Sequence, residues 1–277
     1  MAVDNGDVDD ALQREYQLRL HQNLRIGWSM FDTVVEVVDA QVREETKERQ
    51  PDTTGLMAEL VAHVILGFQQ RGKEPFLDEL ESWAAVFLTH AINSYKCAFD
   101  LLVEGYPAQA LALLRGVMED ASVVQYLAYH PEEASKLSTL RKMMGESKVK
   151  DTVASAKYRI GLQKIGDAAL ANAMSAAHEL INVLSDYAHP SLYAMSMLAF
   201  QEENGIKPTI GFLSFYNEDN FKRAAYAFMG VYPFLVTALE CLVADRLPPW
   251  KARNHALLVE LHEWVRKSTA ANGPITR

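Results

Sequence analysis

The chain has 277 residues, and its 49% hydrophobic and 23% charged content is typical of a folded protein with a sizeable core. A formal net charge of −9, from 27 basic and 36 acidic side chains, argues against broad DNA or RNA binding, which requires a basic surface, but it leaves room for a small basic site. Cys97 and Cys241 are too few for a disulfide framework, and their apolar neighbours predict two buried thiols.

Helical periodicity and end signals divide the chain into helices. We expect residues 1–8 to be disordered and residues 9–277 to form a single helical domain. The pattern predicts helices over about 9–50, 55–70, 76–104, 107–130, 131–144, 167–187, 217–247 and 250–271. The predicted fold class is all-α, a bundle of about seven to nine helices. A polar loop with a short helix is expected at 145–166, and a small two-stranded β-ribbon at 191–216.

Several helix ends have specific signals. Asp52, Thr53 or Thr54 is expected to cap the second helix, and Asn217 the one that starts near 217. Gly105 suits the position just after a helix end, so the helices on either side of it should form an antiparallel hairpin. Pro248 and its neighbour are expected to stop a helix.

One apolar segment imitates a membrane span. The uncharged run AAYAFMGVYPFLVTAL lies between Arg223 and Glu240. It is shorter than the roughly 18 to 20 residues that a span needs, and Pro233 interrupts it. We therefore expect a buried helix and no membrane. The acidic, polar N-terminus carries no secretory signal, which predicts a cytoplasmic protein.

The stretch from Tyr106 to Pro131, YPAQALALLRGVMEDASVVQYLAYHP, predicts the central helix of the fold. It is apolar on all faces, as buried helices are. It nevertheless contains Arg115 and Glu119, which lie on one side of the helix because they are four residues apart. Charges on a buried helix must be paired or used in a site.

We expect His189 to meet this charged pair from a later helix. In a functional site, Arg115 would bind an anion or phosphate, His189 would act as a general acid or base, and Glu119 would orient one of them. Tyr126, two turns after Glu119, would line the pocket, and the binding residues Asp186 and Tyr187 would complete it. The structural alternative is an intrahelical Arg115–Glu119 pair, with His189 capping a helix end.

A metal site is a further alternative. Asp186 and His189 have the one-turn spacing that brings a carboxylate and an imidazole together, and His178 and Glu179 lie two turns earlier. Di-metal bundles use Glu-x-x-His pairs, however, and the chain has none. We therefore assign no metal ligands and expect no cofactor.

Two segments carry a family resemblance. ALALLRGVMEDASVVQYLAYHPEEA and the later SDYAHPS resemble a family of bacterial and archaeal helical proteins of unknown function, in which an Arg-x-x-x-Glu helix precedes a helix that ends at a His-Pro or His-Gly step. Arg115 and Glu119 match the first motif and residues 186–191 the second, and the resemblance covers about 83–216. The family is similar in outline to HEPN-like helical proteins of defence and toxin systems. The HEPN ribonuclease signature, Arg-x(4–6)-His, occurs only at Arg14 and His21, away from the helix end where that superfamily has it.

Three functions are compatible with these patterns. The resemblance implies a HEPN-like ribonuclease, or an enzyme acting on nucleotide phosphates, that works through Arg115 and His189, and it also implies a homodimer. The first alternative is a non-catalytic helical module that binds a ligand or a protein. The second is a metal-dependent bundle enzyme.

Overall fold

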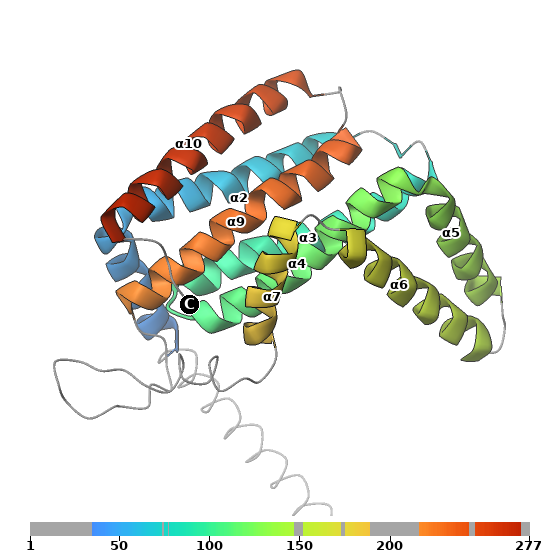
Figure 1. Ribbon diagram of the computed structural model, residues 1–277, viewed down its shortest axis with the longest axis horizontal. Coiled ribbons are helices and arrows are strands. Elements are labelled where there is room, and N and C mark those ends of the chain that lie inside the picture. The colour runs from blue at the N-terminus through green and yellow to red at the C-terminus, as the bar shows by residue number, and fades with distance from the viewer. Residues whose placement is uncertain are drawn as a thin grey trace, which may run out of the picture.

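The computed structural model describes residues 35–73, 75–76, 78–146, 152–172, 175–188, 216–243 and 247–272 (Figure 1). A first helix covers residues 35–49. It is followed by α2 (Pro51–Arg71), α3 (Glu79–Val103), α4 (Pro107–Tyr129), α5 (Pro131–Glu146), α6 (Thr152–Asn172), α7 (Ser175–Ala188), α9 (Glu218–Val243) and α10 (Pro248–Asn272). The described part of the chain contains no strand, which confirms the all-α multi-helix bundle. The predicted disordered tail and, apart from Tyr216, the predicted ribbon lie outside the described residues.

α3 and α4 form the predicted hairpin, and a glycine makes its tight link. The backbone of Gly105 has φ of 86°, a conformation that side chains with a Cβ rarely adopt. The N–H of Tyr106 donates to the carbonyl of Leu101 at 2.8 Å, and the N–H of Gly105 donates to that of Leu102 at 3.3 Å. This is the Schellman arrangement, which satisfies the last carbonyls of α3 before Pro107 opens α4.

α4 is the central helix, as its composition predicts. It packs against α3, α6, α7 and α9, and these surround it in Figure 1. The main core joins α4 to α2, α3, α7, α9 and α10, and its fully buried members include Tyr95, Leu114, Met118 and Phe228.

α5 and α6, which we call the arm, extend from one end of the α3–α4 hairpin (Figure 1). A second core holds the arm in place. It consists of Trp83, Val123, Leu127, Ala134, Leu137, Ile165 and Ala169. The arm therefore has buried contacts of its own, separate from the main core.

The arm corrects the prediction for residues 145–187. α6 is continuous from Thr152 to Asn172, where the sequence favoured a loop, and α7 is a separate helix from Ser175. Gly161 lies inside α6, and a Cβ built at this position would make an ordinary contact, 3.4 Å from Leu140 Cδ1 of α5.

The predicted caps of α2 are also wrong, and α10 begins two residues before its predicted start. α2 begins at Pro51 and its N-cap is Gln50 with no side-chain cap, so none of the three proposed residues caps it. The two prolines at 248 and 249 begin α10, because a proline costs no hydrogen bond in the first turn of a helix. The Asn217 prediction is confirmed, since its Oδ1 accepts the N–H of Asn220 at 2.9 Å.

Cys97 and Cys241 are both exposed, contrary to prediction: they lie on the solvent side of helices whose other faces are buried.

α9 contains the segment that imitates a membrane span. Residues Glu218–Leu242 are long and apolar enough to cross a membrane by length and composition, and just over half of the most apolar window is buried inside the fold. Core helices of soluble proteins have the same properties. α9 passes beside α2 and α4 (Figure 1), and Pro233 lies within it.

α10 docks on α2 through Trp250. The indole stacks on His63 with ring centroids 4.6 Å apart, and its Nε1 donates to the His63 carbonyl at 2.9 Å. Gly67 makes this possible, because a Cβ there would lie 2.4 Å from Trp250 Nε1.

Candidate functional site

Arg115 lies between α4 and α7, close to where the sequence placed the site. Its Nε donates to Glu119 Oε1 at 2.9 Å, and its Nη2 lies 2.8 Å from the same oxygen. Its Nη1 donates to the carbonyl of Ile181 at 2.9 Å and to the hydroxyl of Ser185. Both the intrahelical pair and the reach toward the later helix are therefore present.

These contacts employ all three nitrogens of the Arg115 guanidinium within the protein. Only a fifth of the Arg115 side chain is exposed, whereas 45% of the Glu119 side chain is exposed. Arg115 thus attaches α7 to α4, and the pair lies at the edge of the buried region. Binding a phosphate would require Arg115 to give up one of these partners.

His189 follows α7, which ends at Ala188, and lies outside the described residues. The predicted contact between His189 and Arg115 therefore stays a prediction. The hypothesis of a HEPN-like ribonuclease depends on that contact and stays a prediction too. The exposed Asp186 lies one residue after Ser185, which contacts Arg115. Tyr187 is half-buried and packs against the main core.

Tyr126 is not placed with this group. It packs against the second core, and its ring lies 4.3 Å from that of His130. Tyr126 lies two turns after Glu119, on a similar face of α4. At Tyr126, however, this face packs against the arm rather than against α7.

Sequence reasoning missed a second polar pair, between His90 on α3 and Asp120 on α4. The Nδ1 atom of His90 lies 2.5 Å from Asp120 Oδ2, and the imidazole is largely exposed while the carboxylate is mostly buried. Burial raises the pKa of Asp120, and His90 opposes that shift. The two residues are 30 positions apart, so no sequence spacing indicates their contact.

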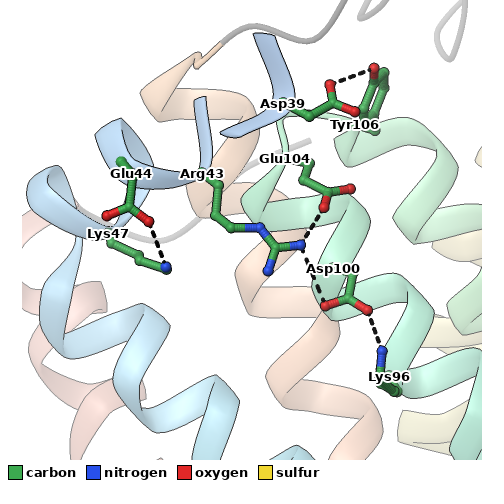
Figure 2. Close-up of polar contacts among 8 residues, drawn as sticks. All are labelled: Asp39, Arg43, Glu44, Lys47, Lys96, Asp100, Glu104 and Tyr106. Carbon is green, nitrogen blue, oxygen red and sulfur yellow. Dashed lines mark hydrogen bonds and ion pairs between the residues drawn. The ribbon is translucent and has the colours of Figure 1, made fainter. Parts of the chain in front are cut away.

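A charged cluster joins the first helix to the end of α3 (Figure 2). Arg43 pairs with Glu104 and lies 3.8 Å from Asp100, which also pairs with Lys96 at 2.6 Å. Beside it, Tyr106 donates to Asp39 at 2.9 Å. Every charge in this cluster has a protein partner, so we interpret it as an anchor for the first helix.

A groove of about 930 Å³ lies where the arm meets α2 and α3. Its walls come from the end of α2, the start of α3 and the middle of α5. The lining includes Phe68, Phe76, Trp83, Val86, Ser138 and Arg141. Phe76 and Val86 are 44% and 50% exposed, so the groove presents apolar surface to solvent. The sequence signal that indicates this groove is Val86, an apolar residue off the main stripe of α3.

The metal alternative has no support among the side chains that the structure describes, where no three His, Cys, Asp or Glu residues come close enough to hold an ion. His178 and His189 lie outside that set, so the metal hypothesis stays untested.

Comparison of the chain with protein-family models, with curated proteins and with solved structures finds no match. The fold and its sites define the class of protein: an all-α bundle with an arm and a groove at the base of that arm.

Proposed function

We propose that this protein is a non-catalytic ligand-binding helical module, and that its ligand occupies the groove between α2, α3 and α5. The observation that carries the proposal is the groove itself. Its volume of about 930 Å³ lies within the usual range for small-molecule sites, roughly 300 to 1,000 Å³. Five aromatic or aliphatic side chains line it together with seven polar or charged ones, so it offers both apolar surface and groups that can orient a ligand.

The contacts of Arg115 favour this function over catalysis at the α4–α7 contact. An enzyme that stabilises a phosphate needs donors directed at the substrate. The nitrogens of Arg115 donate instead to Glu119 and to α7. The groove, by contrast, leaves apolar surface exposed at Phe76 and Val86, where a ligand would exclude water from it.

A neutral fluorescent probe, N-phenyl-1-naphthylamine, tests the proposal. We expect it to bind the wild-type protein and to bind Val86→Asp at least tenfold more weakly, because the new carboxylate would lie in the apolar wall. The matched control is Val259→Asp on α10, since Val259 is 48% exposed and does not line the groove. Exposed substitutions of this kind change the stability little, about 0.5 kcal/mol, and thermal melting would verify that. Absence of probe binding to the wild type, or equal binding to both variants, would contradict the proposal.

A further inference from the structure

The charges at the groove do not all have partners. Asp78 Oδ1 accepts the N–H of Glu81 at 2.8 Å, at the start of α3. Lys142 Nζ lies 3.8 Å from Glu79 Oε1, a loose pair with Lys142 largely exposed. Among the side chains that the structure describes, Arg141 has no carboxylate within ion-pair distance. The lining therefore has one cation, on the α5 side of the groove, without an ion-pair partner among these residues.

Trp83 holds Arg141 in place. The guanidinium carbon lies over the indole ring, 5.6 Å from its centroid. The indole is itself fixed, because it is 5% exposed and its Nε1 donates to Ser138 Oγ at 2.9 Å. Arg141 is exposed, so the N–H donors of its guanidinium can make a forked contact with a carboxylate.

The α2 side of the groove is apolar, and Val86 adds apolar surface from α3. Phe68 and Phe76 come from α2 and the turn after it, and Val86 comes from α3. Arg71 lies behind Phe76, with its guanidinium carbon 5.2 Å from the ring centroid, and pairs with Glu81 at 2.5 Å. A ligand that fits both walls has one anionic end and a hydrocarbon body.

We infer that the ligand is a free anionic amphiphile, a monocarboxylate with a long hydrocarbon body. The carboxylate binds Arg141 with Lys142 beside it, and the hydrocarbon lies along Phe68, Phe76 and Val86. This inference rests on the proposed function, because it specifies the ligand of the same groove.

Three compounds with the same chain test the inference: decanoate, 1-decanol and decylamine, each used below its micelle concentration to displace N-phenyl-1-naphthylamine. We expect decanoate to displace the probe at a concentration at least tenfold lower than decanol, and decylamine to be the weakest. Arg141→Gln should remove the preference for decanoate and leave decanol unchanged. Lys164→Gln on α6, an exposed lysine outside the groove, is the matched control.

The outcomes separate the two proposals. Equal displacement by the three compounds, or a preference for decylamine, would overturn the anionic ligand and leave the groove as a binding site. Equal weakening of decanoate and decanol by Arg141→Gln would also overturn it, since Arg141 would then only shape the wall. Failure of the probe to bind would overturn the proposed function itself. Flotation with phosphatidylglycerol vesicles, without decanoate binding, would point to a membrane surface and contradict the free ligand.

Discussion

His63 is the most perturbed histidine among the residues that the structure describes. It is 6% exposed, its ring is stacked on Trp250, and its Nε2 has no hydrogen-bond partner there. Burial, and next the positive charge of Arg253, lower its pKa from 6.5 to about 4, while Glu59 acts in the opposite direction. The folded protein therefore holds a neutral imidazole at neutral pH.

This pKa predicts how stability depends on pH. Between about pH 4 and 6.5 the unfolded chain binds a proton at His63 that the folded chain does not. The contribution of His63 to the free energy of unfolding is therefore complete above pH 6.5 and falls as the pH drops toward 4, by up to about 3 kcal/mol. We expect His63→Phe, which keeps a stacked ring, to lose this part of the pH dependence and to be no less stable at pH 7. Urea unfolding from pH 4 to 8 measures it.

The control for this prediction is His255→Phe, on the exposed side of α10. It should retain the full pH dependence of the wild-type protein. If His63→Phe showed the same slope as wild type, another group would control the acid sensitivity.

At the residue scale, the sequence predicts contacts within one helix far better than contacts between helices. Arg115 and Glu119 are four residues apart, so their pairing follows from helix geometry alone. His90 and Asp120 meet only because the chain turns at Gly105 between α3 and α4. The sequences of the two helices do not predict which residues of α3 lie opposite which residues of α4. The contact of Arg115 with Ser185 depends in the same way on how α7 docks.

At the scale of the elements, Arg115 attaches α7 to α4, and this predicts the effect of its removal. Arg115→Ala leaves the Ile181 carbonyl and the Ser185 hydroxyl without that donor. We expect a loss of about 1 to 3 kcal/mol of stability, the usual cost of removing hydrogen bonds to a charged group. Hydrogen exchange at the α7 amides should accelerate more than exchange in α3. Chemical denaturation and exchange mass spectrometry measure these two effects.

Lys47→Ala is the control for Arg115→Ala, because Lys47 makes an exposed pair with Glu44 that contributes little. If both variants melted like wild type, Arg115 would have no structural role and the ribonuclease hypothesis would gain weight. A loss of RNA cleavage in Arg115→Ala alone would not identify a catalytic group, since α7 would also move. His189→Ala is the variant that discriminates, because the contacts of Arg115 with α7 are made by Ile181 and Ser185.

Glycine and proline explain which helices were predicted well. They mark helix ends reliably at Gly105 and Pro107, where a left-handed residue and a missing N–H fit one geometry. The same residue types also occur inside helices. Gly161 lies within α6, where the sequence favoured a loop, whereas Pro233 lies within α9, inside the helix that the sequence predicted.

At the scale of the whole molecule, the described helices have two cores. The apolar residues of α3 were predicted to form one buried stripe. Trp83 belongs to the second core, however, while Tyr95 belongs to the main core. Periodicity indicates that a residue is buried and not which helix covers it. The groove lies where the two cores meet. The sequence analysis did not predict it because the apolar pattern of α3 does not show that its residues belong to two cores.

The two cores predict that the arm opens separately from the rest of the bundle. Leu137 on α5 and Leu114 on α4 are both buried, at 1% and 0% exposure, but they belong to different cores. Replacing either with Ala should cost about 2 to 5 kcal/mol where its core is intact. We expect Leu114→Ala to lower the stability of all described helices. Leu137→Ala should accelerate hydrogen exchange in α5 and α6 and leave α9 protected, because partial openings follow cooperative units.

Exchange mass spectrometry on the two variants distinguishes this prediction from a single cooperative unit, in which both variants would lose protection in every helix.

The position of the groove predicts a further effect, since a ligand there contacts α3 and α5 together. It would bind only while the arm is closed, so a ligand at 100 times its Kd should raise the free energy of opening the arm by about 2.7 kcal/mol. Leu137→Ala should therefore weaken probe binding although Leu137 does not line the groove. Unchanged binding in that variant would mean that the arm and the groove are independent.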